Sequence, residues 1–333
     1  MKIVLIDDYI SRTAVQELSG ETVNTLFSVK GKTDHQANGA YVLRSHGTIC
    51  ASILASVMPR HVELHTISTH NKDSTITLEN VCTALGWCLK GPPDYICMSL
   101  GSSNWLEVKK LGQITKQLAD AGSRIFAACA NNGHVVFPAA YSWVTGIRYE
   151  SGIIGLYQER DSPIGNNIIV GDFTTPVLEK LERENVFFMS RTNSMAAPYA
   201  LGKMLSEGLI LTDLPAYTDR TPKLIHKELS MPATALHGPL NQMRELLALF
   251  QKEGYQAALL TSRQESEWEG MVLRATSANF FDWVHSLEEA GILLLDMEGD
   301  LLSFQKYADH SIHLAGQDVR TTYNEILQFF GTA

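Results

Sequence analysis

Short apolar segments alternate with amphipathic ones along the first 130 residues, and this alternation restricts the fold more than any other feature. The segments KIVLID, DYICMSLG and SRIFAACAN are rich in β-branched and apolar residues, which is typical of strands. The stretch 108–122 between two of them carries apolar residues at helical spacing and closes at Gly122, where a helix C-cap is expected. Strands that alternate with helices form parallel sheets. The sequence therefore predicts an α/β fold with a doubly wound parallel sheet.

The pattern changes near residue 215, which predicts a second domain. Residues 1–214 hold the α/β pattern, and the turn-rich, polar stretch 215–229 is interpreted as a linker. Residues 230–333 contain two helix candidates that each end at a glycine and lead into apolar runs, so we predict a smaller α+β domain. The whole chain has a formal charge of −9, and the part from residue 216 onward carries −7 of it. We expect this domain to recognise substrate or to mediate homo-oligomer formation.

Composition excludes several classes of protein. The acidic balance argues against a nucleic-acid partner. No apolar run approaches the ~18 residues of a membrane span, and the apolar stretch at the N-terminus is too short for a signal peptide. All five cysteines lie in apolar surroundings within the first 130 residues, which is typical of buried free thiols in a reducing compartment. We therefore expect a cytoplasmic protein with no membrane partner.

Four motifs in the first domain carry residues suited to acyl transfer. Asp7 ends the first strand in VLIDDYI, His46 begins a helix in SHGTICASILA, Asn131 follows a strand in FAACANNG, and Ser194 enters a helix in TNSMAAPYALG. A serine hydroxyl is a poor nucleophile unless a neutral imidazole takes its proton, and a carboxylate must orient that imidazole. An amide such as that of Asn131 can stabilise the oxyanion that forms. These residue types together predict nucleophilic catalysis by serine.

In their order and context, the four motifs resemble those of the subtilisin-like serine peptidases, over roughly residues 1–210. The corresponding family patterns are D-[ST]-G, HGTxxA, AAxGNxG and GTSMAxPHVxG. The resemblance implies a peptide or protein substrate, Ser194 as the nucleophile, His46 as the general base and Asp7 as its carboxylate partner. Asn131 and the backbone N–H of Ser194 are the implied oxyanion donors. We also expect Pro198 to lie in the first turn of the helix that follows Ser194, where its missing N–H is tolerated.

The resemblance also implies a substrate-binding strand and a specificity pocket. Family members bind an extended peptide against a strand with a Ser-Leu-Gly sequence, so that main-chain hydrogen bonds provide affinity. Small side chains on the strand that enters the oxyanion asparagine leave room for a sizeable substrate side chain. Cys129 on that strand is interpreted as a small buried hydrophobe, with a redox-sensitive lid as the alternative. The implied substrate-binding residues are Ser99, Leu100 and Gly101 on one strand and Ala127, Ala128 and Cys129 on the other.

Six residues depart from the family pattern: Asp8, Tyr9, Ala130, Thr192, Asn193 and Tyr199. Asp8 follows Asp7 where the family has Ser or Thr, so Asp8 is a rival for the catalytic role, a cation ligand or the cap of a turn. Because neighbouring side chains in a strand point to opposite sides, only one of the two can meet His46, and we predict Asp7. Thr192 replaces a glycine and Asn193 replaces a threonine just before the serine. These two substitutions are expected to narrow the approach to the site or to change the oxyanion donors.

No metal or cofactor site is identified in the sequence. His61 and His65 fall in a predicted strand, and His310 and His313 lack supporting carboxylates. Calcium is neither required nor excluded. Because only six residues precede Asp7, we expect folding without a propeptide. The sequence predicts a cytoplasmic serine endopeptidase with a restricted substrate, such as a precursor peptide or a partner protein. The alternatives are a non-catalytic relative that binds peptides and an acyl or ester hydrolase.

Overall fold

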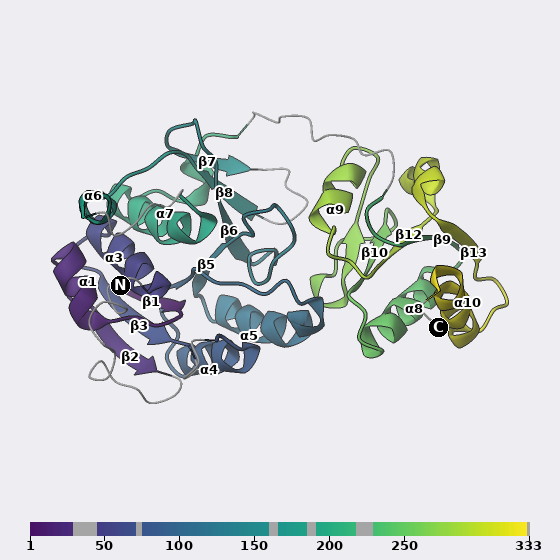
Figure 1. The fold of residues 1–333 in the computed structure, drawn as a ribbon, viewed down its shortest axis with the longest axis horizontal. Helices are drawn as coiled ribbons and strands as arrows, with labels where there is room; N and C mark the ends of the chain where they lie inside the picture. The colour runs from purple at the N-terminus through teal and green to yellow at the C-terminus, as the bar shows by residue number, and fades with distance from the viewer. Residues whose placement is uncertain (29–44, 71–74, 160–165, 185–190, 218–228, 332–333) are drawn as a thin grey trace. The chain divides into compact units, whose positions relative to one another are not determined.

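The protein is described by a computed structural model in which the chain divides into two units (Figure 1). The described residues are 1–28, 45–70, 75–159, 166–184, 191–217 and 229–331. The first unit comprises residues 1–102, 110–132 and 136–219, and the second comprises 103–109, 133–135 and 220–333. Most of the predicted linker, residues 218–228, lies outside the described residues.

The first unit is built on an eight-stranded sheet with the order β2-β3-β1-β4-β5-β6-β8-β7. All neighbouring strands are parallel except β7, which is antiparallel to β8. This arrangement confirms the predicted α/β sheet. The strands are β1 (Lys2–Asp7), β2 (Asn24–Ser28), β3 (Glu63–Ser68), β4 (Tyr95–Met98), β5 (Arg124–Ala128), β6 (Val144–Tyr149), β7 (Leu156–Glu159) and β8 (Asn166–Val170).

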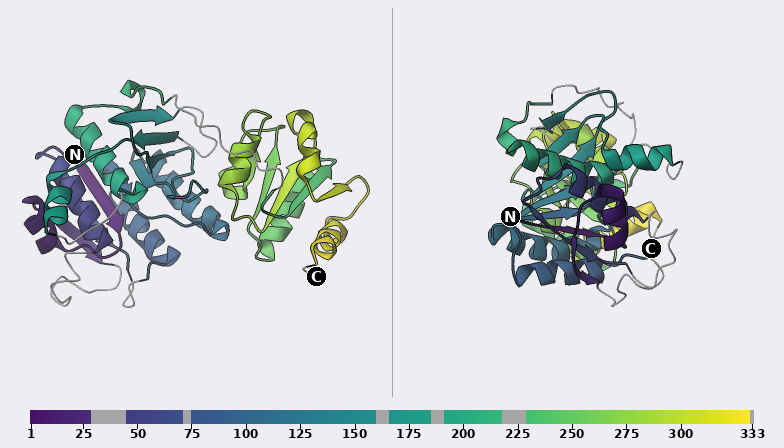
Figure 2. Two further views of the ribbon diagram at one scale, coloured as in Figure 1. Left: turned by 45° about the horizontal axis from the view of Figure 1, so that its top comes forward. Right: turned by 90° about the vertical axis from the view of Figure 1, so that its left-hand side faces the viewer.

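Helices cover both faces of this sheet (Figures 1 and 2). Because both faces are covered, the central strands need apolar residues at nearly every position, and β1 buries every residue from Ile3 to Ile6 completely. Helices α1 (Arg12–Ser19), α3 (His46–Val57), α6 (Pro176–Arg183) and α7 (Asn193–Glu207) cover one face, and α4 (Leu78–Leu89) and α5 (Val108–Asp120) cover the other.

The parallel arrangement brings polar residues to one edge of the sheet. Strand β1 ends at Asp7, β4 ends at Met98 and β5 ends at Ala128. Helix α3 begins at His46 and helix α7 begins at Asn193. Since the carboxyl ends of parallel strands share one edge, residues far apart in the sequence meet there, as is usual for functional sites in such sheets.

The second unit contains a five-stranded sheet with the order β11-β10-β12-β9-β13, and every pairing in it is parallel. The sequence indicated an α+β arrangement, and the structure corrects this to a parallel α/β arrangement. Its strands and α-helices are β9 (Ala233–His237), α8 (Leu240–Lys252), β10 (Ala257–Thr261), β11 (Val272–Arg274), α9 (Phe280–Ser286), β12 (Ile292–Asp296), β13 (His310–His313) and α10 (Val319–Phe330).

The physical reason for the correction is burial on both faces of the second sheet. All five residues of β10 and of β12 are buried. On one face, Leu259 and Leu294 pack in a core with Phe250 of α8 and Ile326 of α10. Continuous apolar runs of this kind are typical of parallel strands, but they do not show which strands pair. Among the residues that the structure describes, no helix is long and apolar enough to span a bilayer.

Candidate active site

Asp7, His46 and Ser194 form one hydrogen-bonded chain at the carboxyl edge of the first sheet. The Nδ1 atom of His46 lies 3.0 Å from Oδ1 of Asp7, and its Nε2 atom lies 2.8 Å from Oγ of Ser194. Asp7 is 1% exposed, so water screens its interaction with the imidazole only weakly. A carboxylate that lies against Nδ1 favours the tautomer in which Nδ1 carries the ring proton. Nε2 is then free to accept the proton of the serine hydroxyl. The geometry is therefore that of an activated serine.

Asp8 accepts a hydrogen bond from the backbone at the start of α3. Its Oδ1 atom accepts a 2.6 Å hydrogen bond from the backbone N–H of Gly47, while its own backbone N–H donates to Oδ1 of Asp7 at 2.8 Å. Burial and the neighbouring Asp7 carboxylate raise the pKa of Asp8 to about 6, against the lowering effect of the Gly47 N–H. The structure thus places Asp7, and not Asp8, against His46.

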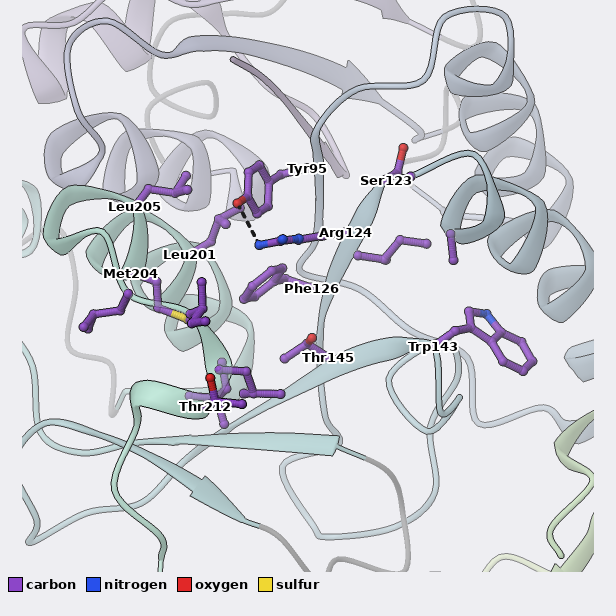
Figure 3. A pocket seen from close by; sticks show the side chains of 17 residues that line it. Tyr95, Ser123, Arg124, Phe126, Trp143, Thr145, Leu201, Met204, Leu205 and Thr212 are labelled. Carbon is purple, nitrogen blue, oxygen red and sulfur yellow. Dashed lines mark hydrogen bonds between the residues drawn. The ribbon is translucent and has the colours of Figure 1, made fainter.

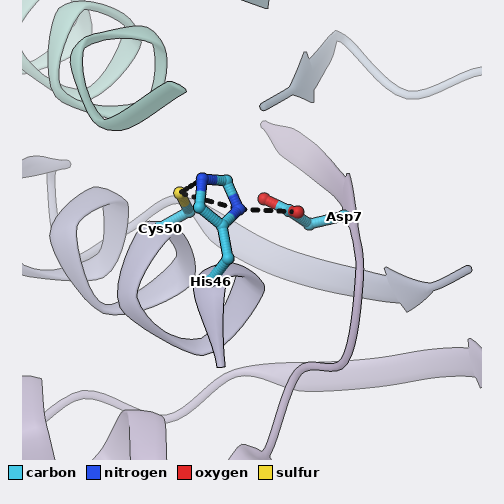
Figure 4. Close-up of side chains that lie close together, drawn as sticks. All are labelled: Asp7, His46 and Cys50. Carbon is cyan, nitrogen blue, oxygen red and sulfur yellow. Dashed lines mark hydrogen bonds and ion pairs between the residues drawn. The ribbon is translucent and has the colours of Figure 1, made fainter. Parts of the chain in front are cut away.

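Cys50, one helical turn after His46, lies against the imidazole (Figure 4). Its sulfur is 3.9 Å from Nδ1 and 3.8 Å from Nε2 of His46. A negative charge on Cys50 and the carboxylate of Asp7 would both raise the pKa of His46, against the lowering effect of burial. Burial raises the pKa of the Cys50 thiol, so this group is protonated at neutral pH. Asp7 is therefore the anion that raises the pKa of His46 under those conditions.

The Cys50 thiol also satisfies a backbone carbonyl of the serine helix. Pro198 lies inside α7 and not in its first turn as expected. It has no N–H, so the carbonyl of Ser194, four residues earlier, lacks its helical donor. The sulfur of Cys50 lies 3.5 Å from that carbonyl oxygen and donates to it. This contact connects α3 to the first turn of α7, and nothing in the motif comparison had assigned it.

Asp7, His46 and Cys50 are also a set of possible metal ligands. One ligand atom from each lies within 4.8 Å of the others. However, both ring nitrogens of His46 already face hydrogen-bond partners, Asp7 and Ser194. Burial also keeps Cys50 protonated, whereas a cysteine binds a metal as the thiolate. A metal would have to displace the serine from the imidazole, so this donor set fits acyl-transfer chemistry better than a resident metal.

Asn131 is held by the loop that precedes the serine. Its Oδ1 atom accepts a 3.0 Å hydrogen bond from the backbone N–H of Asn193. This bond fixes the orientation of the amide and leaves Nδ2 to donate elsewhere. The buried side chain of Asn193 in turn donates to the carbonyls of Cys129 and Ala130, at 3.0 and 2.9 Å, and accepts from the backbone N–H of Tyr149 at 2.7 Å. Asn193 thus joins the serine loop to the ends of β5 and β6.

The sequence as a whole matches a known family. A model of the subtilase family, peptidase family S8, matches residues 3–279. This chain belongs to the subtilase family. It is accordingly a serine endopeptidase. No curated protein matches the sequence of this subtilase.

Solved structures that are similar to this subtilase are also proteases. A lanthipeptide protease is 16% identical, with a TM-score of 0.42 over 61% of this chain and 71% of that chain. A cold adapted subtilisin-like serine proteinase is 14% identical, with a TM-score of 0.42 over 63% and 81%. The psychrophilic subtilisin-like protease Apa1 from the Antarctic psychrotroph Pseudoalteromonas sp. AS-11 is 18% identical, with a TM-score of 0.34 over 44% and 36%.

In this subtilase, the segment Ser99–Gly101 continues directly from β4 beyond the carboxyl edge. Ser99 is buried and Gly101 is exposed. A Cβ atom on Gly101 would lie 2.7 Å from the side chain of Val136 and 3.0 Å from the carbonyl oxygen of Phe137, so only glycine fits there. The next residue, Ser102, exchanges two backbone hydrogen bonds with Phe137, at 2.8 and 2.9 Å. Val136 is therefore a neighbour of the expected substrate-binding segment, and the sequence had given no sign of it.

The expected wall of the specificity pocket, Ala127–Cys129, is buried along its whole length. The sulfur of Cys129 contacts Oδ1 of Asn167 at 3.6 Å, and the side chain of Asn167 donates to Glu159 at 3.0 Å. Burial raises the pKa of Cys129 to about 12, so its thiol is protonated and unreactive. These facts favour the interpretation of Cys129 as a small buried residue over that of a redox-sensitive lid.

Thr192 makes a contact with the nucleophile that the family glycine cannot make. Its Oγ1 atom lies 2.9 Å from Oγ of Ser194, and either hydroxyl can donate. The hydroxyl of Ser194 therefore faces two partners, His46 and Thr192. The sequence marked Thr192 as a departure from the family, but the direct contact depends on the conformation of the side chain.

Proposed function

We propose that this subtilase is an intracellular endopeptidase that cleaves a restricted set of peptide or protein substrates through an acyl-enzyme on Ser194. The observation that carries the proposal is the hydrogen-bonded chain from Asp7 through His46 to Ser194, at 3.0 and 2.8 Å. Each of the three residues faces the partner that its role in acyl transfer requires.

The reaction follows from these contacts. Ser194 Oγ attacks the scissile carbonyl while His46 Nε2 accepts its proton. His46 then gives that proton to the leaving amine, and water repeats the cycle to release the acyl group. Asp7 holds the imidazole and stabilises its cation. Nδ2 of Asn131 and the backbone N–H of Ser194 are the proposed donors to the oxyanion, because the contact of Asn131 Oδ1 with Asn193 directs the amide donor outward.

An extended peptide is the substrate form that fits the neighbouring strands. We propose that it pairs with Ser99, Leu100 and Gly101 and places one side chain against Ala127, Ala128 and Cys129. Main-chain pairing would provide affinity with little preference for sequence, and the pocket would provide selection. The acidic part of the chain from residue 216 onward, with 9 basic and 16 acidic residues, would add selection for basic or amphipathic segments. Homo-oligomer formation is the alternative role for this part of the chain.

The state of the cysteines supports an intracellular location. All five are free thiols, and four of them are buried. A protein with five free thiols suits a reducing compartment. A precursor peptide or a partner protein is the proposed substrate class, because an intracellular endopeptidase must discriminate among many exposed chains.

The test is to incubate the purified protein with a peptide library derived from a proteome and to identify the products by mass spectrometry. The proposal predicts cleavage at a narrow set of sites, with none in Ser194→Ala. A parallel panel of esters without peptide bonds separates a peptidase from an ester hydrolase. Binding of peptides without cleavage would instead identify a non-catalytic relative. Loss of selection at high salt, with cleavage of short peptides unchanged, would support recognition by the acidic part of the chain.

A further inference from the structure

The first unit contains a pocket at the opposite edge of the sheet from the active site (Figure 3). Its volume is about 480 Å³. Tyr95 and Arg124, which line it, are the first residues of β4 and β5, and Thr145 is the second residue of β6. The candidate catalytic residues lie at the other edge of this sheet, where Asp7 is the last residue of β1 and Asn131 follows the carboxyl end of β5. The pocket is therefore separate from the active site and has no role in the reaction proposed above.

Most of the pocket wall is apolar. Leu201, Met204 and Leu205 from the second half of α7 form one side, and Phe126 and Trp143 lie among the other lining residues. The pocket volume falls in the range of roughly 300–1,000 Å³ that is usual for small-molecule sites, and such sites combine apolar walls with a few polar groups. The shape and lining thus suit a ligand that is largely hydrocarbon.

Arg124 gives this apolar pocket a positive charge. It is the single charged side chain among the lining residues that the structure describes. Figure 3 shows it between Tyr95 and Phe126, and its Nη1 atom donates to the hydroxyl of Tyr95 at 3.4 Å. Its guanidinium also lies 5.8 Å from the centre of the Tyr95 ring. Within the described parts of the chain, no carboxylate forms an ion pair with Arg124.

We propose that this pocket binds a small anionic amphiphile, with its hydrocarbon chain against the α7 side and its anionic head at Arg124. Burial of the chain would provide most of the affinity, because each methylene removed from water contributes favourably. The exposed guanidinium would select an anion and fix its position, since arginine matches the geometry of carboxylates and phosphates. The inference does not depend on the proposed peptidase activity.

The test is isothermal titration calorimetry of the full-length protein with dodecanoate and with dodecanol, each below the concentration at which it aggregates. We expect saturable binding of dodecanoate at one site, with dodecanol bound more weakly. No saturable binding of dodecanoate, or equal binding of both compounds, would overturn the proposal. The hydrolytic activity is not a readout here, so failure of this proposal is distinguishable from failure of the proposed function.

Variants place the ligand in the pocket. Arg124→Gln should weaken dodecanoate binding by about fivefold, the scale of an exposed ion pair, and leave dodecanol binding unchanged. Thr145→Phe, which fills the pocket, should abolish binding of both, and Thr212→Phe provides a second filling variant if the first does not fold. Arg60→Gln removes an exposed arginine outside the pocket and should bind like the wild type. Wild-type affinity for dodecanoate in Arg124→Gln or in the folded filling variants would overturn the assignment.

Discussion

The hydroxyl oxygen of Thr192 lies 2.9 Å from the hydroxyl oxygen of Ser194. His46 Nε2 lies at 2.8 Å from the same serine oxygen, so the serine has two hydrogen-bond partners in the resting state. When Ser194 donates to His46, Thr192 donates to Ser194 and occupies a lone pair of the nucleophile. A hydrogen bond donated to this oxygen makes it less nucleophilic, and the ester oxygen of the acyl-enzyme is a weaker acceptor than a hydroxyl. The contact therefore stabilises the ground state more than the intermediate.

The first prediction is that Thr192→Val increases kcat by about two- to tenfold, the effect of one neutral hydrogen bond. Valine has a similar shape but no hydroxyl. Thr192→Ser retains the hydroxyl and should behave like the wild type. Steady-state kinetics on one peptide substrate test both variants. A fall in kcat for Thr192→Val would show that the threonine hydroxyl assists the reaction instead.

The second prediction concerns pH. His46 must be neutral to accept the serine proton, and its pKa is raised in the folded protein. Activity should therefore appear only as the pH rises through this raised pKa, so the midpoint of the acid limb of kcat/KM should lie above 6.5. The pH dependence of kcat/KM measures this midpoint directly. A midpoint at or below 6.5 would contradict the assigned interaction with Asp7.

Asp7→Asn supplies the matched control for the pH profile. Without this carboxylate, the pKa of His46 loses an effect that raises it while burial still lowers it, so the acid limb should move to lower pH. Turnover should fall by about 10⁴-fold, because an amide no longer favours the required tautomer. Cys50→Ala should leave the limb nearly unchanged, since the thiol is protonated in that pH range.

The third prediction tests the oxyanion donor. Asn131→Leu should lower kcat by about 10²- to 10³-fold with little change in KM, because the donated hydrogen bond strengthens only as charge develops on the substrate. Asn131→Asp keeps an acceptor for the backbone N–H of Asn193 but has no amide donor. It should lose activity to a similar extent. Full activity in Asn131→Asp would show that the residue only holds the loop.

The fourth prediction concerns stability. The pKa of Asp8 is about 6 in the folded protein, compared with 3.8 ordinarily, so the folded state binds this proton more tightly than the unfolded state. The contribution of Asp8 to the stability of the wild type therefore falls as the pH rises from about 4 to above 6. Asp8→Asn does not titrate, and its free energy of unfolding should exceed that of the wild type above pH 6, by up to about 3 kcal/mol.

Urea denaturation at about pH 4 and about pH 7.5 measures this difference. The advantage of Asp8→Asn should be absent at the lower pH and complete at the higher one. Asp120→Asn, at an exposed position, is the control and should show no such dependence. An equal effect of Asp8→Asn at both pH values would contradict the raised pKa.

The sequence predicted the α/β fold because strand and helix patterns alternate at short range. It also predicted that Asp7 would face His46, because alternation along the first strand leaves one of two adjacent aspartates on that side. The structure brings these two residues and Ser194 together, and their catalytic roles stay predictions. The carboxyl-edge rule for parallel sheets explains why motifs far apart in sequence could be assigned to one site.

Other features depend on information that the motifs do not contain. Cys50 lies four residues after His46 on the same helix, so helical spacing was a usable signal for their contact. The bond between Thr192 and Ser194 depends on a side-chain rotamer. In the second unit, β13 pairs with β9 across more than 70 residues, and apolar runs alone do not specify such pairing.

The central claim is that Ser194 is a nucleophile activated by His46 and Asp7. Its most direct test is reaction with a fluorophosphonate probe, followed by mass spectrometry of the labelled peptide. The account predicts one phosphonylated residue, Ser194, slower labelling in His46→Ala, and no labelling in Ser194→Ala, whose turnover should fall on the order of 10⁶-fold. A wild-type protein that stays unlabelled, or a Ser194→Ala variant with undiminished turnover, would contradict it.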